Sequence, residues 1–114
     1  MAFEKFTRIR SRGYTPQISI WSRGQIGLNQ AVLDKYKIGE YAILFFDRDT
    51  KRVGIKFTNN KSESGAAKII KRKTGGASLS ARAFLVNYDL ISEKTKSYNV
   101  EFDKDNEMLI IKVE

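Results

Sequence analysis

The sequence contains no cysteine and no histidine, and it has a single proline among its 114 residues. Without cysteine there is no disulfide bond, thiol nucleophile or thiolate metal site. Without histidine the chain lacks the usual general base and the commonest metal ligand, and no side chain titrates near neutral pH unless its surroundings shift its pKa. We therefore expect a binding protein without a cofactor rather than an enzyme.

Long hydrophobic runs are also missing. No apolar stretch approaches the roughly 20 residues that cross a bilayer, and the opening MAFEKFTRIR has no apolar segment of a signal peptide. With 41% hydrophobic and 30% charged residues, the composition is typical of a soluble globular protein, and the length fits a single domain over residues 1–114. We expect a cytoplasmic location and no membrane partner.

Acidic residues are in short supply. The chain has 21 Lys and Arg against 13 Asp and Glu, a formal net charge of +8. Residues 1–57 hold 11 basic and 5 acidic residues, whereas residues 58–114 hold 10 and 8. Such an excess favours a polyanionic partner such as nucleic acid, with DNA expected before RNA. The alternative is that the charge only keeps a small protein soluble.

Alternating apolar and polar residues predict two short strands, at residues 18–20 and 25–28, joined by a tight turn. Asn29 follows as a good N-cap, because its side-chain oxygen can accept a hydrogen bond from a free N–H of the first helical turn. Residues 31–38 are then expected to form a short helix, which Gly39 ends as a residue free to adopt a positive φ.

A hairpin is predicted after this helix, at residues 41–57, where a continuous apolar run and an alternating run flank a polar loop. The second half of the chain repeats the same order of elements. A shift of 51 residues places Leu79 and Ser80 at the positions of Leu28 and Asn29.

The second copy contains a predicted helix at residues 83–90, in which Tyr88 corresponds to Tyr36, and a hairpin in which a shift of 56 matches Phe102 with Phe46. Each copy is too small to bury its own apolar strands, so the two are expected to pair within one chain. The predicted boundaries are a basic arm or strand at 1–14, repeat one at 15–57, a linker at 58–65 and repeat two at 66–114.

The run QIGLNQAVLDKYKIGEYAILFF with RVGIKF resembles the AbrB, SpoVT and MazE swapped-hairpin family, and KIIKRKTGGASLS onward resembles it less closely. The resemblance implies an α+β, β-rich fold in which two β-β-α-β-β repeats interleave their hairpins into one small barrel, here an intrachain pseudo-dimer, with a homodimer of the chain as an option. It also implies DNA binding and transcription regulation. The family's proline cap is Asn29 or Ser80 here, and its basic helix pair is Leu33-Asp34 or Leu85-Val86, so only the turn charges carry over.

The N-terminal segment FTRIRSRGY supplies the first candidate contacts. If it is extended, Arg8, Arg10 and Arg12 fall on one face about 6.6 Å apart, because same-face residues recur every second position. With Phe3, Phe6 and Tyr14 nearby, such a stripe suits phosphate contacts and base stacking. The alternative is an exposed edge strand whose charges keep other strands from pairing with it.

Two turns supply the remaining candidates. The segment KIIKRKTGG carries four cations before two glycines whose backbone N–H groups could approach a phosphate. Arg23 lies in the corresponding turn of the first copy, beside or opposite this one, and Trp21 is available for stacking. The alternatives are an ordinary exposed turn and a tryptophan that covers a second apolar surface. The candidate contacts in these turns are Trp21, Arg23, Lys68, Lys71, Arg72 and Lys73.

Paired carboxylates occur in the two predicted hairpin loops, at Asp47 and Asp49 and at Asp103 and Asp105. Their equivalent places favour hydrogen bonding within turns over a metal site. We therefore predict a small nucleic-acid-binding protein, such as a DNA-binding transcriptional regulator, with the strandedness of its target open. The alternative is a protein–protein interaction or assembly module, either antitoxin-like or a structural subunit, that binds no nucleic acid.

Overall fold

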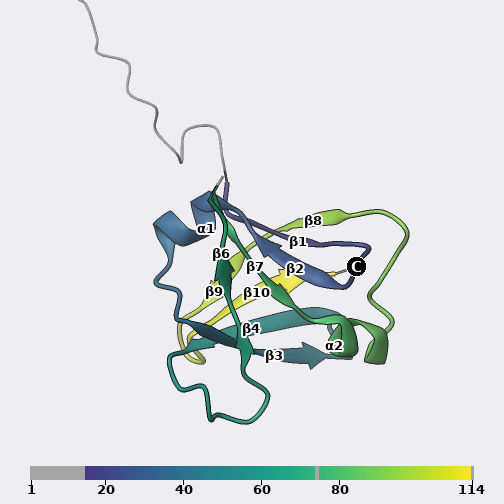
Figure 1. The fold of residues 1–114 in the computed structure, drawn as a ribbon. Coiled ribbons are helices and arrows are strands. Elements are labelled where there is room, and N and C mark those ends of the chain that lie inside the picture. Colours follow the sequence, from purple (N-terminus) through teal and green to yellow (C-terminus); the bar gives the residue numbers. More distant parts are fainter. Residues whose placement is uncertain (1–14, 74, 114) are drawn as a thin grey trace, which may run out of the picture.

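The computed structural model describes residues 15–73 and 75–113, and within these ranges the chain forms ten strands and two short helices (Figure 1). The predicted arm with Arg8, Arg10 and Arg12 lies outside the described residues. The elements are β1 (Gln17–Ile20), β2 (Gln25–Leu28), α1 (Gln30–Lys35), β3 (Tyr41–Asp47), β4 (Arg52–Thr58), β5 (Ala67–Lys68), β6 (Ile70–Lys71), β7 (Ala77–Ser80), α2 (Arg82–Asn87), β8 (Lys96–Asn99), β9 (Glu101–Asp103) and β10 (Met108–Lys112).

The strands form two antiparallel sheets, neither of which is closed on itself. Sheet A has the order β6-β7-β2-β1-β8, and sheet B has the order β5-β3-β4-β10-β9. At the centre of each sheet, a strand from the first half of the chain pairs with a strand from the second half, β2 with β7 and β4 with β10. The prediction of a β-rich domain with few helices is confirmed.

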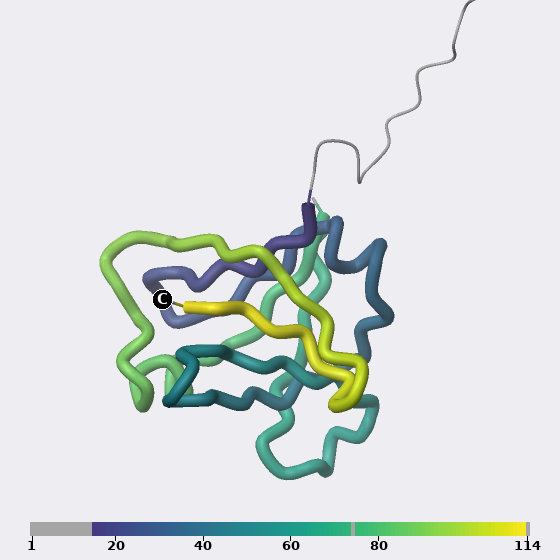
Figure 2. Tube along the Cα trace, turned by 180° about the vertical axis from the view of Figure 1, so that it is seen from behind, coloured from purple at the N-terminus to yellow at the C-terminus, as the bar shows by residue number. Residues whose placement is uncertain are grey.

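Two segments pass from one sheet to the other (Figure 2). β5 pairs with β3 in sheet B, and after Ile69 the chain continues as β6, which pairs with β7 in sheet A. β8 pairs with β1 in sheet A, and after Val100 the chain continues as β9, which pairs with β10 in sheet B. Strands that bend between packed sheets make the corners of such an arrangement, so the two sheets are joined by chain at both sides.

The core fills the space between the inner faces of the sheets. Successive side chains of a strand point to opposite faces, so every second residue of the central strands is buried. The helices add one fully buried side chain each, Val32 from α1 and Leu85 from α2. The buried residues of the sheets include Ile18, Ile20, Ile26, Leu28, Ala77 and Leu79 in sheet A, and Ala42, Val53, Ile55, Leu109 and Ile111 in sheet B.

Helix α1 begins as predicted and ends early. The Oδ1 atom of Asn29 accepts hydrogen bonds from the N–H groups of Val32 and Gln17, both at 3.1 Å, so the cap also ties the helix to β1. The helix ends at Lys35 rather than at residue 38, because Tyr36 is extended, with φ −118° and ψ 148°. Gly39 does not have a positive φ; a Cβ atom there would lie 2.7 Å from the carbonyl oxygen of Thr58, so close backbone approach explains this glycine.

Helix α2 also differs from its prediction of residues 83–90. Ser80, the expected counterpart of the Asn29 cap, is the last residue of β7, and the N-cap position is Ala81, which makes no side-chain cap. The helix closes with a Schellman motif, in which the N–H of Leu90 bonds to the carbonyl of Leu85 at 2.8 Å and Asp89 adopts φ +56°. This left-handed residue ends the helix before residue 90.

Candidate nucleic-acid interface

Trp21 lies on the outer face of sheet A. It follows β1, and its indole packs over Gly27 of β2, where a Cβ atom would come within 2.6 Å of Cζ2 and 2.9 Å of Cε2 of the ring. Since glycine has no side chain, the half-buried indole rests directly on the strand backbone. The expected stacking position is thus built into the sheet surface rather than held on a free loop.

Small polar side chains surround the indole. Ser19 and Ser78 flank Gly27 on the neighbouring strands, and Ser97 stands beside Ser19 on β8. The hydroxyl oxygens of Ser19 and Ser97 are 2.7 Å apart. The row ends at Ile70 of β6, which pairs with Ser78 and is 60% exposed, so the row has small residues only from β8 to β7.

Arg72 reaches the same place from the other half of the chain. It follows β6, and its guanidinium carbon lies 5.1 Å from the centroid of the Trp21 ring, within the range of a cation–π contact. The structure therefore brings together two candidate residues that are 51 positions apart in the sequence. One is aromatic and the other cationic, which are the two kinds of side chain that stack on bases and contact phosphates in proteins that bind single strands.

The other cations are divided between the two ends of the β2–β7 pair. Arg23 lies in the turn at the Ser80 end, where its neighbour Gly24 approaches Arg82, since a Cβ atom on Gly24 would be 2.8 Å from Cβ of Arg82. Lys71 and Lys73 flank the turn at the opposite end. The sequence left open whether the two basic turns lie beside or opposite each other, and the structure places them at opposite ends of the β2–β7 pair.

Lys68 is separated from the rest of its sequence cluster. It belongs to β5 and pairs with Tyr41 in sheet B, whereas Lys71, on β6, pairs with Ala77 in sheet A. The chain changes sheets at Ile69 between them. Lys68 and Lys71 therefore lie on different sheets, although both belong to the run KIIKRK.

The two glycines of the second turn have structural roles. Gly75 and Gly76 adopt φ of +113° and +76°. The N–H of Gly75 donates to the carbonyl of Arg72 at 3.1 Å, and that of Gly76 donates to Oε1 of Gln30 at 2.9 Å. Both N–H groups expected to be available for a phosphate have partners inside the protein, so among the described residues of this turn the side-chain cations remain as candidate contacts.

The paired carboxylates form turns, as predicted. Oδ1 of Asp47 accepts from the N–H groups of Asp49 and Thr50, and Oδ1 of Asp103 accepts from those of Asp105 and Asn106. The hydrogen bond from the Asn106 side chain is the main reason why the pKa of Asp103 is lowered. Within the described ranges, no three acidic residues lie close enough to hold a metal ion.

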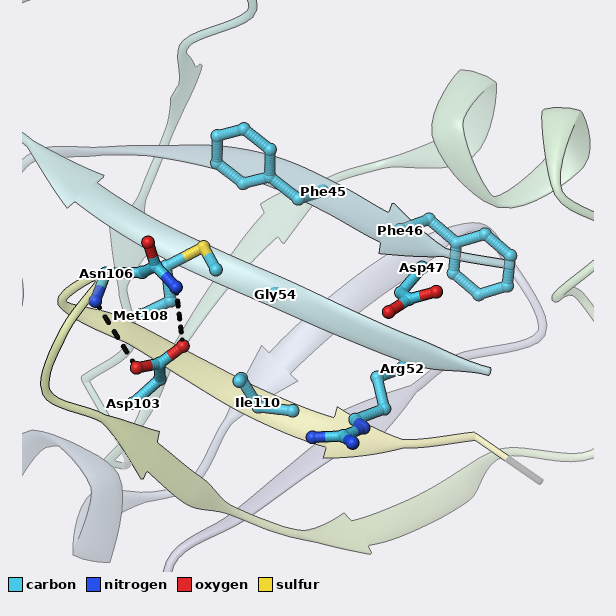
Figure 3. A pocket seen from close by; sticks show the side chains of 9 residues that line it. All are labelled: Phe45, Phe46, Asp47, Arg52, Gly54, Asp103, Asn106, Met108 and Ile110. Carbon is cyan, nitrogen blue, oxygen red and sulfur yellow. Dashed lines mark hydrogen bonds between the residues drawn. The ribbon is translucent and has the colours of Figure 1, made fainter. Parts of the chain in front are cut away.

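An apolar surface on the outer face of sheet B was not predicted. Phe45, which is 45% exposed, lies beside a hollow of about 280 Å³ that Met108 and Ile110 also line, with Asp103 and Asn106 at one end and Arg52 toward the other (Figure 3). Met108 lies close over Gly54, since a Cβ atom there would be 3.1 Å from its sulfur. The signal in the sequence is that the runs YAILFF and MLII are apolar at every position rather than at alternate ones.

Two aromatic clusters were also missed as candidate sites. The rings of Tyr36 and Phe102 stack with centroids 5.6 Å apart, and those of Tyr88 and Phe46 lie 4.6 Å apart. In each pair, a tyrosine at the end of a helix in one half contacts a hairpin phenylalanine of the other half. The sequence shifts had already matched Tyr36 with Tyr88 and Phe46 with Phe102 as equivalent aromatic residues. Neither shift shows by itself that a tyrosine of one half contacts a phenylalanine of the other.

Comparisons with family models, with curated proteins and with solved structures gave no match to this chain. In the parts of the chain that the structure describes, the helices have six residues each, and none is long and apolar enough to cross a membrane.

Proposed function

We propose that this chain is a small nucleic-acid-binding protein whose contact surface is the outer face of sheet A. The observation that carries the proposal is the Arg72 guanidinium over the Trp21 indole, beside a row of glycine and serine. Proteins that bind nucleic acid strands combine aromatic rings, on which bases stack, with cations that neutralise phosphates. Both groups meet here on one face.

The cations at the two ends of the β2–β7 pair extend this surface. A strand that crosses sheet A over the indole meets Arg23 and Arg82 at one end and Lys71 and Lys73 at the other. The arginines at positions 8, 10 and 12 add positive charge to the same chain. Because such contacts go to phosphates, they give affinity without sequence choice.

We also propose that the chain consists of two degenerate repeats of the AbrB-like type. The strand registers support this. Ile26 pairs with Leu79 and Leu28 pairs with Ala77, and adding 51 to Leu28 and Ile26 gives the two partners in exchanged order. In sheet B, Val53 with Ile111 and Ile55 with Leu109 exchange in the same way at a shift of 56. A two-fold relation between equivalent strands produces this pattern.

The aromatic pairs support interleaved hairpins. Tyr36 of the first half contacts Phe102 of the second, and Tyr88 of the second contacts Phe46 of the first. Exchange of hairpins between two units places each hairpin against the helix of the other unit. The family's basic pair on the helix is replaced by Leu33-Asp34, so the proposal is binding to the strand backbone and to bases at Trp21, not operator reading by α1.

Fluorescence anisotropy with labelled single-stranded and duplex oligonucleotides at several salt concentrations tests the proposal. Four or more phosphate contacts on duplex DNA give a slope of log K against log[salt] of about −3.6 or steeper, and about −2.8 on single strands. Arg72→Ala should weaken binding and reduce the slope, whereas Lys56→Ala, an exposed cation on sheet B, should leave both nearly unchanged. Absence of binding at low salt to either oligonucleotide contradicts the proposal.

A second candidate function is an assembly module, and the apolar outer face of sheet B favours it. Phe45, Met108 and Ile110 form a surface on which a second copy of the chain can pack. Sedimentation velocity of the unmodified protein and of the Phe45→Lys variant tests this second candidate function. A dimer that Phe45→Lys dissociates supports it, and a monomer at all concentrations contradicts the homodimer.

A further inference from the structure

A second hollow, of about 650 Å³, lies where the chain leaving α1 meets the β9–β10 hairpin. Figures 1 and 2 show these two segments side by side at one end of the molecule. Its volume lies within the roughly 300 to 1,000 Å³ of most small-molecule sites. The residues that matter for its chemistry are Tyr36, Phe102, Lys35, Lys37, Lys104 and Glu107.

The floor of this hollow is aromatic. Phe102 pairs in register with the buried Leu109, yet it is 46% exposed. Its ring stacks on Tyr36 with an interplanar angle of 28°. The exposed ring of Phe102 offers a planar ligand a stacking surface.

The rim of the hollow is positively charged. Three lysines, Lys35, Lys37 and Lys104, line it together with a single acid, Glu107. The ammonium group of Lys35 lies 5.6 Å from the centroid of the Tyr36 ring. Lysine ammonium groups bind phosphates as point charges, so the rim favours an anionic group attached to a planar one.

The counterpart cluster shows what a third ring does in this arrangement. There Phe84 meets Tyr88 edge-on at 5.1 Å, and Arg48 lies 4.9 Å from the centroid of the same ring. Under the helix shift of 52, the counterpart of Phe84 is Val32, which is fully buried in the core, so α1 presents no second ring to Tyr36. The hollow beside the Tyr36–Phe102 pair is instead lined by a third aromatic residue, Phe57, and stays open to a planar ligand.

We propose that this hollow binds a nucleotide, with its base against Phe102 and Tyr36 and its phosphate among Lys35, Lys37 and Lys104. The site goes beyond the nucleic-acid surface on sheet A, since it uses neither Trp21 nor the basic turns. The same chemistry can come from a free nucleotide or from one unit of a single strand. The experiment separates these two sources.

Isothermal titration calorimetry of the full chain provides the test, with ATP, GTP, CTP and UTP as ligands and with adenosine and inorganic triphosphate as their two halves. At least one nucleotide should bind about tenfold or more tightly than either half, because stacking and charge contacts act together. Phe102→Ala and Lys104→Ala should each weaken binding by about tenfold, the loss of one stacking or charged contact.

Two control variants match these substitutions. Phe45→Ala removes an equally exposed phenylalanine from the outer face of sheet B, and Arg48→Ala removes the counterpart of Lys104 from the filled cluster. Both should leave nucleotide binding unchanged. If Phe102→Ala fails to fold, by circular dichroism, Lys104→Glu and Lys37→Glu carry the test.

The outcomes are distinct. The proposal is overturned if Phe102→Ala and Lys104→Ala leave nucleotide binding intact. It is also overturned if inorganic triphosphate alone binds as tightly as ATP. Binding of a single-stranded oligonucleotide but of no free nucleotide, with loss in Phe102→Ala, assigns the hollow to a strand. No binding of either ligand at the hollow overturns it as well. The sheet A surface is judged separately, because Arg72→Ala should change oligonucleotide affinity and leave free nucleotide binding unchanged.

Discussion

Gly27 holds the only tryptophan of the sequence in place by lacking a side chain. The indole of Trp21 occupies the space in which a β-carbon would stand, and Arg72 lies over the ring. A change of one methyl group in β2 is thus transmitted to a contact between the two halves of the chain. The single tryptophan also makes this contact visible by fluorescence.

Gly27→Ala should displace the indole, because the new Cβ atom would lie within 2.6 Å of the ring. We expect a red-shifted tryptophan emission, weaker oligonucleotide binding and a loss of about 1 kcal/mol of unfolding free energy. Gly54→Ala is the matched control, since its Cβ atom would meet the flexible Met108 side chain at 3.1 Å and Cβ of Phe45 at an ordinary contact distance of 3.6 Å. Unchanged emission in Gly27→Ala would contradict the packing described for Trp21.

Asp103 predicts a pH dependence. Its pKa is lowered in the folded protein, chiefly by the hydrogen bond from the Asn106 side chain. Because the folded pKa lies below the unfolded value of about 3.9, the stabilisation is fully present above that value and is lost as the pH falls through the folded pKa. Asn106→Ala should raise the pKa of Asp103, as an NMR titration of its carboxyl group measures. An unshifted titration would show that the side-chain hydrogen bond does not act on it.

At the scale of elements, the caps of the two helices are unequal. Asn29 accepts hydrogen bonds from Val32 and Gln17 and donates to the carbonyl of Thr15 at 2.9 Å, so one side chain joins α1 to the start of β1. Its sequence counterpart Ser80 lies in β7 and caps no helix. The difference arises because β7 extends through Ser80, so that the single residue between this strand and α2 is Ala81, whereas the single residue between β2 and α1 is Asn29.

Asn29→Ala should therefore cost about 1 to 2 kcal/mol of unfolding free energy, the usual range for loss of an N-cap. Ser80→Ala is the natural comparison and should change stability by less than about 0.5 kcal/mol, because Ser80 is exposed. Urea unfolding followed by circular dichroism measures both. Equal effects of the two substitutions would mean that Asn29 does not act as a cap.

The strands of the first half were predictable from local pattern, whereas the helix ends and the changes of sheet in the second half were not. Alternation located β1 and β2, because one buried face imposes a period of two on the sequence. The end of α1 depends on Tyr36, whose ring stacks on Phe102, 66 positions further along the chain. A contact over such a separation leaves no mark in the residues next to the helix.

The sequence predicted individual residues of the candidate site, but it did not predict which of them share one surface. Trp21 and Arg72 each stood out locally, but their contact requires the register of β2 with β7. Lys68 was grouped with Lys71 because they are neighbours in sequence, whereas the bend at Ile69 sends them to different sheets. Charge pattern alone does not reveal a change of sheet.

For the whole molecule, the central pairs of both sheets join the two halves of the chain. The strand pairs β2–β7 and β4–β10 supply most of the buried side chains of the two sheets, so neither half has a core of its own. The segment between the halves is exposed and consists of turns around Asn60 and Glu63. It connects the halves without contributing to the core.

Separate fragments 1–61 and 62–114 should consequently be largely unfolded as monomers and should regain the native circular dichroism spectrum when mixed. The physical reason is that each fragment lacks the partner for its central strands, whose backbone groups must be paired when buried. NMR spectra of the fragments alone and together provide the measurement. A fragment that folds as a monomer contradicts this prediction, and a homodimer of fragment 1–61 would support the proposed repeats.

Placing Val32 and Phe84 at corresponding sites of a single chain has a consequence for how the protein can diverge. In a homodimer encoded by one gene, every substitution occurs at both symmetric sites, so closing one aromatic cluster closes the other. Here one cluster contains its third ring and the other has Val32 turned into the core. Under the proposal of two repeats in one chain, each half can mutate independently, so that one end of the molecule can specialise while the other stabilises the fold.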